Sequence, residues 1–376
     1  MTPAYDEAWF ASRATPGVRG LRAYDPGHDV VALRARHGAA LAELGSNENP
    51  YGPSPRARRA MQDALELAHR YPDPRGAALK HALASLHGID AGSIVLGNGS
   101  HELLMLLAQV FAGPGDAVAY PRYGFAVFAL AAQAAGALAQ VAAALLSQGP
   151  MPHGHDLEAL RGVIDDRTRL VYLANPNNPT GTWLEHDALD AFLDDVPAEV
   201  LVVVDEAYAE LADAPGYRSM LPRVPRRPNL VVTRTFSKAY GLAGLRCGYA
   251  VAAPGLVAVM ERVRESFNVN GPALAACAAA VQDQPWVERV RAENSRQRDA
   301  LAGALRARGL GVGPSQTNFL LVEFGDATPE VEARLLERGV VLRPMAGYGL
   351  GRYSRITVGT ADENARLLRA LDKVRA

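Results

Sequence analysis

The stretch VLVVVDEAY (residues 200–208) runs through five apolar residues onto a carboxylate, and LVVTRTFSK (230–238) runs through a second apolar segment onto a lysine. A third run, LVYLA (170–174), leads into NPNNPTG. Apolar runs of this length without alternation are typical of strands buried on both faces of a parallel sheet. Because 185–193 between two of these runs has helical spacing, the pattern predicts βαβ units and an open α/β sheet.

The N-terminal side extends the same pattern. Apolar residues recur with helical spacing in 56–70, 76–87 and 100–112. Ile94–Leu96 is a short predicted strand that ends in GNGS. The Ala-rich segment 129–146 contains Gln133, Gly136 and Gln140, so it is predicted as a packed helix, a turn and a strand, and not as a membrane span.

The last third of the chain changes character. Its apolar pattern predicts helices at 285–309, 329–338 and 361–375, and strands at 318–324, 340–343 and 355–358. This mixture is typical of a smaller α+β domain, and NVNGP interrupts the pattern near 265–275. We therefore expect an irregular N-terminal arm (1–40), a large domain with a mostly parallel central sheet flanked by helices (41–268) and a small C-terminal domain (269–376).

Bulk composition excludes several function classes. The 376 residues carry a formal net charge of −1, so no global field attracts nucleic acid or an acidic membrane surface. Cys247 and Cys277 form no CxxC pair, which argues against a structural metal site. The first 20 residues lack the apolar core of a secretory signal, and the low cysteine use fits a reducing compartment. We expect a cytoplasmic protein with a small-molecule ligand.

Polar residues follow four of the predicted strands. They are Asn98–His101, Asn175–Gly181, Asp205–Tyr208 and Thr235–Lys238. In open α/β sheets, ligands bind beyond the carboxyl ends of the strands. If the four strands share one sheet, these residues converge on one site.

Asp205 and Lys238 are the chemically distinctive members of this group. A carboxylate at the mouth of an apolar strand needs a cationic partner, and a protonated pyridine nitrogen is one such partner. A desolvated lysine has a lowered pKa and can form an imine with an aldehyde. The alternatives are a carboxylate that caps the next helix for Asp205 and an ordinary solvated lysine for Lys238.

An anion site is predicted beside them. The turn Gly97–His101 enters a helix whose free N–H groups would bind an anion. Thr235 and Ser237 add hydroxyls, and Arg246 adds a guanidinium that suits a phosphate. Together these groups describe a phosphate cup.

Ten segments carry a resemblance to a known family. They are SNENPYGPSP (46–55), YPDP (71–74), GNGSHELL (97–104), ANPNNPTGTW (174–183), VVVDEAY (202–208), RTFSKAYGLAGLRCGY (234–249), FNVN (267–270), TNFLLVEF (317–324), LRPMAGYGL (342–350) and SRITVGT (354–360). The chain resembles the class I/II aminotransferases, fold-type I enzymes that depend on pyridoxal 5′-phosphate (PLP). The TFSK…GLRxGY block is highly specific for these enzymes, and NENPxGPSP resembles their histidinol-phosphate branch.

The resemblance implies roles in holding the cofactor. Lys238 would bind PLP as a Schiff base and move the proton between the substrate Cα and the cofactor C4′, while Asp205 would pair with the pyridine nitrogen. Asn178 and Tyr208 would bind the phenolic oxygen, and Tyr123 would stack on the ring. The cofactor phosphate would be bound by Ser100, His101, Thr235, Ser237 and Arg246, and by Tyr51 from the partner subunit of a homodimer.

The resemblance also implies substrate contacts. Arg355 would bind the α-carboxylate, and Tyr24, Asn47 and Arg343 would contact the far end of the substrate. Each assignment has an ordinary structural alternative: Tyr123 as a core aromatic residue, Arg355 as one half of a surface ion pair. Arg352 lies near Arg355 in the glycine-rich stretch 347–355, so the choice between these arginines depends on strand register.

The implied reaction is ping-pong amino transfer between histidinol phosphate and 2-oxoglutarate, in histidine biosynthesis. Two other enzymes could be built from the same parts, namely an aromatic amino-acid aminotransferase and a PLP-dependent decarboxylase of a phosphorylated amino acid. A non-catalytic regulatory domain of PLP fold is a third alternative. The presence of Lys238, Asp205 and Arg355 argues against that last one.

Overall fold

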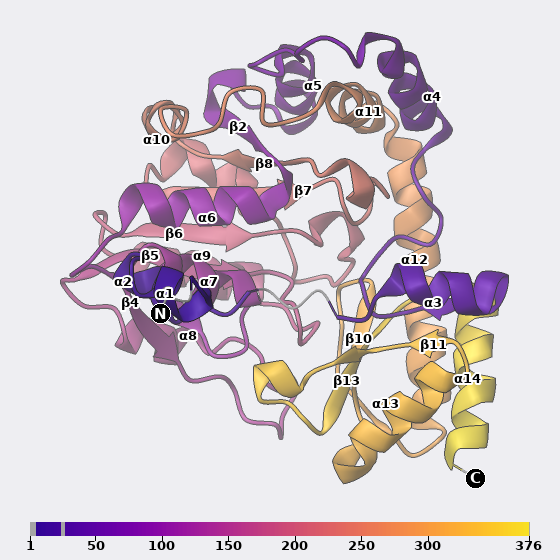
Figure 1. Cartoon of the computed structure of the whole chain (residues 1–376). Helices are drawn as coiled ribbons and strands as arrows, with labels where there is room; N and C mark the ends of the chain where they lie inside the picture. Colours follow the sequence, from indigo (N-terminus) through magenta and orange to yellow (C-terminus); the bar gives the residue numbers. More distant parts are fainter. Residues whose placement is uncertain (1–4, 24–26, 376) are drawn as a thin grey trace.

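The large sheet contains seven strands in the spatial order β2-β8-β7-β6-β5-β3-β4 (Figure 1). The computed structural model describes residues 5–23 and 27–375. Neighbouring strands pair in parallel except at β8, which is antiparallel to β2 and β7. The strands are β2 (Ile94–Gly97), β3 (Ala117–Pro121), β4 (Leu138–Ala142), β5 (Thr168–Ala174), β6 (Leu201–Asp205), β7 (Leu230–Thr235) and β8 (Gly248–Val251). The predicted, mostly parallel sheet is confirmed.

Helices cover both faces of this sheet. Alternate side chains of β6 enter different cores: Val202 and Val204 pack into one, and Val203 into the other. The first core includes residues of α4 (Pro55–Ala64), α5 (Ala77–His87), α8 (Leu157–Gly162), α9 (His186–Asp195) and α11 (Gly271–Val281). The second includes residues of α6 (Gly99–Phe111), α7 (Ala126–Ala134) and α10 (Pro254–Met260). Burial on both faces explains the uninterrupted apolar strands.

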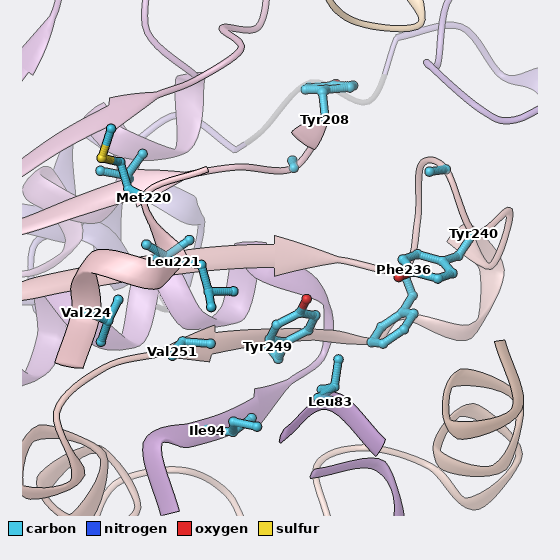
Figure 2. Close-up of a cluster of buried hydrophobic side chains, with 14 of the residues drawn as sticks. Leu83, Ile94, Tyr208, Met220, Leu221, Val224, Phe236, Tyr240, Tyr249 and Val251 are labelled. Carbon is cyan, nitrogen blue, oxygen red and sulfur yellow. The ribbon is translucent and has the colours of Figure 1, made fainter. Parts of the chain in front are cut away.

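Figure 2 shows part of the first core, around the loop that follows β7. The ring of Phe236 is fully buried, 5.8 Å from that of Tyr249 on β8 and 4.9 Å from that of Tyr240. The Tyr249 hydroxyl lies 2.8 Å from His87 Nε2. Because Phe236 and Tyr240 are both anchored in the core, the loop between them is held in place.

The second sheet is smaller and antiparallel, with strands in the order β12-β13-β10-β9. The strands are β9 (Gly311–Val312), β10 (Phe319–Glu323), β12 (Arg343–Pro344) and β13 (Tyr353–Thr357). Residues of α13 (Thr328–Glu337) and α14 (Ala361–Arg375) share a core with them. The N-terminal side contributes β1 (Ala42–Glu43), which pairs in parallel with β11 (Val340–Val341).

Helix α12 (Gln284–Arg306) joins the two parts of the molecule (Figure 1). Val287 and Val290 lie in the first core of the large sheet, whereas Leu301 and Leu305 lie in the core of the small sheet. The hydrophobic cores therefore do not divide at 268/269, because α11 packs with the large sheet. We propose a boundary within α12, with the 41–45 segment belonging to the small part, since Ala42 and Leu44 lie in its core.

The N-terminal arm differs from the expected irregular segment. It forms α1 (Glu7–Ala11), α2 (Pro16–Arg19) and α3 (Val30–His37), and none of these helices contains a buried residue. Asp6 and Asp29 cap the first and third helices through their side chains. These local caps explain helices that apolar periodicity did not reveal.

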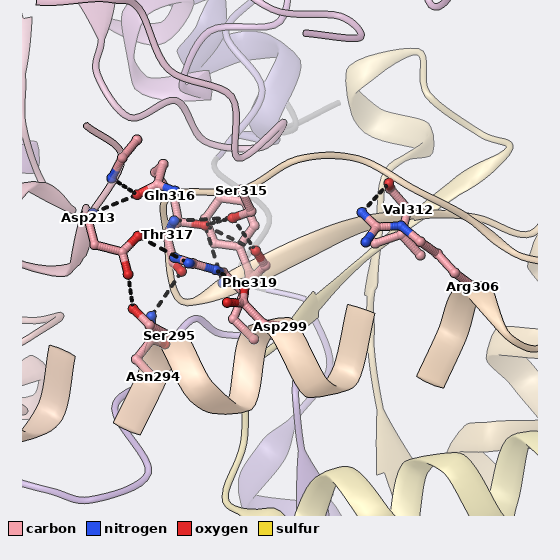
Figure 3. A network of polar contacts seen from close by, with 12 residues as sticks. Asp213, Asn294, Ser295, Asp299, Arg306, Val312, Ser315, Gln316, Thr317 and Phe319 are labelled. Atoms are coloured by element: carbon pink, nitrogen blue, oxygen red, sulfur yellow. Dashed lines mark hydrogen bonds and ion pairs between the residues drawn. The ribbon is translucent and has the colours of Figure 1, made fainter. Parts of the chain in front are cut away.

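A polar network fixes the entry to β10, beside α12 (Figure 3). The Gln316 side chain accepts from the backbone N–H groups of Asp213 and Ala214, at 2.6 and 2.9 Å. Arg298 and Ser295 of α12 donate to the Asp213 carboxylate. These contacts tie the small sheet to the loop after β6.

The Ala-rich segment forms α7 and β4, as predicted. The turn between them passes through Gly136, whose φ of +75° favours glycine. Within residues 5–23 and 27–375, no helix combines the length and the apolar character needed to cross a membrane.

Candidate active site

A cavity of about 380 Å³ lies where the carboxyl ends of the large-sheet strands meet the small sheet. All four predicted groups of strand-end residues contribute to its wall. The lining includes Asn47, Glu48, Ser100, His101, Phe125, Asn178, Asp205, Tyr208, Thr235, Ser237, Lys238, Arg246 and Arg355. The predicted convergence of the strand ends is therefore observed.

Asp205 ends β6 and is almost completely buried. Its Oδ1 accepts from the Thr233 hydroxyl at 2.7 Å. Burial is the main cause that raises the pKa of Asp205 to about 6, and the nearby Glu206 adds to it. The raised pKa means that nearby groups do not offset the cost of burying the carboxylate. A cationic ring nitrogen placed in the cavity would stabilise its ionised form.

Lys238 lies between the two anchored aromatic residues after β7. Its Nζ donates to the Asn47 carbonyl at 3.1 Å. Burial, followed by the positive charge of Arg355, lowers the pKa of the amine to about 8. The negative charges of Glu48 and Asp205 raise this pKa and so partly offset the lowering. A substantial neutral fraction near pH 8 makes this amine a nucleophile and a base.

The predicted phosphate cup forms one end of the cavity. Ser100 and His101 lie in the first turn of α6, where the side chain of the N-cap residue Asn98 bonds none of the helix N–H groups. The Ser237 hydroxyl lies 3.0 Å from Thr235 Oγ1 and 3.4 Å from Arg246 Nη1. Gly99 has a φ of +77°, which favours glycine, and a Cβ there would lie 2.8 Å from Arg246 Nη2.

Arg355 and Asn178 close another side of the cavity. Arg355 Nη1 donates to Asn178 Oδ1 at 2.6 Å, and Nη2 donates to the Gly45 carbonyl at 2.8 Å. Arg352, the alternative from sequence, is exposed and pairs instead with Glu323 and Asp326. The strand register thus directs Arg355, and not Arg352, into the cavity.

A second chamber of about 710 Å³ shares Phe125 and Arg355 with the first cavity. Arg343 lines it and lies directly opposite Arg355 across the β12–β13 pair. The described lining contains Arg122, Arg343, Arg355 and His28, but no Asp or Glu. Two guanidinium groups on one wall of the chamber suit an anionic ligand.

Three predicted tyrosines have different outcomes, and the expected roles of Tyr51 at a partner subunit and of Tyr24 stay predictions. Tyr123 does not line the cavity; its ring packs edge-on against His153, and Phe125 lines the wall instead. The Tyr51 hydroxyl donates to Glu293 of its own subunit at 3.4 Å. Tyr24 lies outside the described residues.

Asn47 lines the cavity beside Tyr208 and Lys238, and its expected contact with the far end of the substrate stays a prediction. Its Nδ2 donates to the Tyr208 hydroxyl at 3.0 Å, and its carbonyl accepts from Lys238. The same carbonyl accepts from Asn318 at 3.0 Å, a contact that sequence reasoning missed. Thr233 was also missed, although its place opposite Asp205 follows once the β6–β7 register is known.

These groups fit PLP at both ends. A buried carboxylate faces the cavity without a strong cation at hydrogen-bond distance in the described chain, which suits the protonated ring nitrogen. At the other end, uncapped N–H groups, two hydroxyls and a guanidinium suit a phosphate. Lys238 lines the space between them, as an aldehyde requires.

The sequence and fold were compared with known proteins. A model of the family described as aminotransferase class I and II matches residues 40–371. The chain belongs to this family. Among relatives of this aminotransferase, histidinol-phosphate aminotransferase 1 of Nitrosococcus oceani is 47% identical over 98% of both chains. Histidinol-phosphate aminotransferase 2 of Pseudomonas aeruginosa is 45% identical over 98% of this chain and 99% of the other.

A solved structure extends the comparison. Histidinol-phosphate aminotransferase from Sinorhizobium meliloti, in complex with pyridoxal-5′-phosphate, superposes on this aminotransferase with a TM-score of 0.86. The two share 31% identity over 96% of this chain and 97% of the other. The fold-type I class expected from the sequence is thereby confirmed.

Proposed function

We propose that the protein uses PLP to transfer the amino group of histidinol phosphate to 2-oxoglutarate, or the reverse with glutamate as donor, as a step of histidine biosynthesis. One observation carries the substrate assignment: Arg343 and Arg355 lie opposite each other on β12 and β13, and both line the chamber beside the cavity. That arrangement suits a phosphorylated substrate. Relatives named for this activity cover 98% of the chain.

When bound, PLP supplies an aldehyde that takes up amino groups and a conjugated ring that withdraws electrons from the adjacent carbon. Asp205 keeps the proton on the ring nitrogen. Neutral Lys238 would take the proton from the carbon that bears the substrate amino group and hold it for return during the amino transfer. Tyr208 and Asn178 donate to the phenolic oxygen. The phosphate is bound by Ser100, His101, Thr235, Ser237 and Arg246.

Arg355 and Arg343 bind the anionic groups of the two substrates. Arg355 fixes the carboxylate of 2-oxoglutarate through its forked guanidinium. In the other half-reaction, Arg343 and Arg355 bind the phosphate of histidinol phosphate. Asn47 acts through Tyr208 and Lys238, which it contacts, and the expected substrate contact of Tyr24 stays a prediction.

Steady-state kinetics with 2-oxoglutarate as acceptor test the substrate assignment. We expect kcat/KM for L-histidinol phosphate to exceed that for L-phenylalanine by about two orders of magnitude, because a site built for an anion rejects analogues that lack it. Phe125, Tyr348 and Leu130 line the chamber and would accept a phenyl ring, which favours an aromatic substrate as the second candidate. A higher kcat/KM for phenylalanine would select that candidate, and CO₂ release from a phosphorylated amino acid without a keto acid would indicate a decarboxylase.

Arg343→Gln is expected to raise KM for histidinol phosphate roughly ten- to a hundredfold, because one charge-assisted contact to the phosphate is lost. Activity on phenylalanine should change little, since that substrate carries no phosphate. Arg352→Gln is the matched control, because Arg352 is exposed and pairs outside both cavities. An equal loss on both substrates would show that Arg343 supports the fold of the site and not phosphate recognition.

The lowered pKa of Lys238 predicts a pH profile for cofactor capture. The neutral amine attacks the aldehyde, so below its pKa of about 8 the capture rate should rise about tenfold per pH unit. Above pH 8 the rate should level off. Stopped-flow absorbance of the cofactor-free protein mixed with PLP measures this rate. Arg355→Gln should move the midpoint upward, because Arg355 lowers the pKa. A rate that climbs steadily to pH 10 would contradict the lowered pKa.

We further propose a cytoplasmic homodimer that contacts its partner through an exposed apolar surface. Leu67 and Tyr71 are 65% and 83% exposed, and the Tyr71 ring stacks on Phe267 at 4.7 Å. Tyr51 keeps its expected contact with the cofactor phosphate of the partner subunit as a prediction. Sedimentation of the wild type and of a Leu67→Asp variant tests this surface.

A further inference from the structure

The segment FNVN (267–270) joins α10 to α11 and has no part in the reaction described above. Phe267 has a φ of +60°. The two asparagines in the segment contact the two separate halves of the phosphate cup. Asn268 reaches the turn before α6, and Asn270 reaches the loop before Arg246.

Asn268 is bonded to the α6 turn in three ways. Its Nδ2 donates to Glu102 Oε1 at 2.8 Å and to the Leu96 carbonyl at 3.2 Å, and its own carbonyl accepts from Asn98 Nδ2 at 2.7 Å. Its Oδ1 accepts from Arg264 Nη1, which fixes the amide orientation. The side chain is therefore committed to holding this turn.

Glu102 is the acidic residue in the first turn of α6. Its Oε2 accepts from the backbone N–H of Asn98. A carboxylate at this position competes with any other anion for the N-terminal N–H groups of the helix. Since Asn268 and the Asn98 N–H occupy both carboxylate oxygens, Glu102 is held away from the groups that face the cavity.

Asn270 supports the other half of the cup. Its Nδ2 donates to the Leu245 carbonyl at 3.1 Å, and its Oδ1 accepts from Ala273 N as the cap of α11. Arg246, which follows Leu245 in the chain, has a φ of +53°, a strained left-handed conformation for a side chain of this size. The anchored carbonyl holds the backbone that directs Arg246 toward Ser237.

We propose that Asn268 and Asn270 are positioning residues that assemble the two halves of the anion cup for the cofactor's 5′-phosphate. The proposal rests on the proposed function in one respect, that PLP binds in this cavity. Neither side chain lines the cavity, so both act through neighbours: Asn268 through Asn98 and Glu102, and Asn270 through Leu245 and Arg246. Their effect should be specific for the phosphate of the cofactor and not for its ring.

Two near-isosteric variants test the proposal. Asn268→Asp keeps the acceptor for Arg264 but places a carboxylate against Glu102. Asn270→Asp keeps the cap on α11 but removes the donor to Leu245. For each variant, the dissociation constants of PLP and of pyridoxal, which lacks the phosphate, are measured by absorbance on the cofactor-free protein. We expect PLP to weaken roughly ten- to a hundredfold and pyridoxal by less than about twofold.

A compensating change sharpens the test. In Asn268→Asp combined with Glu102→Gln, the new amide at 102 can donate to the new carboxylate at 268, so PLP affinity should return in part. Asn229→Asp is the matched control, because its amide donates to the Val200 carbonyl at the opposite end of β6. That variant should bind both ligands as the wild type does.

Each result bears on the proposal. Equal weakening of PLP and pyridoxal, or unchanged binding of both in variants with the wild-type melting temperature, would overturn it. If Asn268→Asp fails to fold, Asn270→Asp decides, since its helix cap is retained. Failure of the wild-type protein to bind PLP at all would refute the proposed function instead, so the two failures are distinguishable.

Discussion

Replacing Lys238 by alanine is expected to lower the transamination rate by about four orders of magnitude or more, because one side chain supplies both the covalent attachment and the proton transfer. The loss should appear in kcat and not only in KM. Thermal stability should not fall at neutral pH, because a lowered lysine pKa means that the charged amine destabilises the folded state. Steady-state and single-turnover kinetics, combined with a melting curve, measure both effects.

Lys238→Arg is the informative companion variant. Arginine retains the positive charge but forms no imine and does not give up its proton near neutral pH. If charge alone mattered, this variant would be active. We expect it to be as inactive as Lys238→Ala. Lys80→Ala is the control, because Lys80 pairs with Glu261 away from the cavity, and this variant should keep full activity.

Asp205→Asn is expected to have opposite effects on activity and on stability. Activity should fall about a hundred- to a thousandfold or more, because the ring nitrogen loses its anionic partner. The cofactor-free protein should become more stable at pH 7.5, by about 3 kcal/mol. This value follows from a pKa raised from 3.8 to about 6, at 1.36 kcal/mol per unit. The asparagine can still accept from Thr233.

The pH dependence gives this stability prediction its sign. Because folding raises the pKa of Asp205 from 3.8 to about 6, its ionised carboxylate destabilises the fold fully above pH 6. Below the unfolded-state pKa of 3.8 the group is protonated in both states, and the destabilisation disappears. The stability advantage of Asp205→Asn should therefore shrink as pH falls from 6 to 4 in urea unfolding of the cofactor-free protein. Asp190→Asn serves as control, because Asp190 is paired with Arg223 at the surface and should show no such gain. A loss of stability in Asp205→Asn at pH 7.5 would contradict the burial argument.

The large sheet could be predicted from sequence because its strands are apolar on both faces. Val200–Val204 and Leu230–Thr233 were found for that reason, within one or two residues of β6 and β7. The N-terminal helices were missed because they bury nothing, and a helix without an apolar face leaves no periodic signal. The domain boundary was expected at 268/269, where the sequence pattern breaks locally. Helix α11 nevertheless packs into the first core of the large sheet, and such contacts between distant segments cannot be read from a local pattern.

Prediction of the site succeeded where chemistry lies at strand ends. Asp205 ends β6 and Lys238 lies shortly after β7, while Arg246 lies just before the antiparallel β8, so the sheet topology brings all three to one edge. Side-chain direction could not be read from sequence, so Tyr123 was predicted to stack on the cofactor, whereas Phe125 lines the cavity. Asn47 was expected to contact the substrate, but its φ of +56° and its bonds to Tyr208 and Lys238 could not be read from the sequence.

Borohydride trapping with peptide mapping tests the central claim most directly, and it is simple here because the chain has only three lysines, Lys80, Lys238 and Lys373. Reduction of the protein with PLP should attach the cofactor to the Lys238 peptide alone. Prior addition of histidinol phosphate without a keto acid should abolish the adduct, because the cofactor then carries the amino group and no longer bonds the lysine. Phenylalanine at the same concentration should leave it largely intact. An adduct on Lys80 or Lys373, or one on Lys238 that persists with histidinol phosphate, would contradict the account.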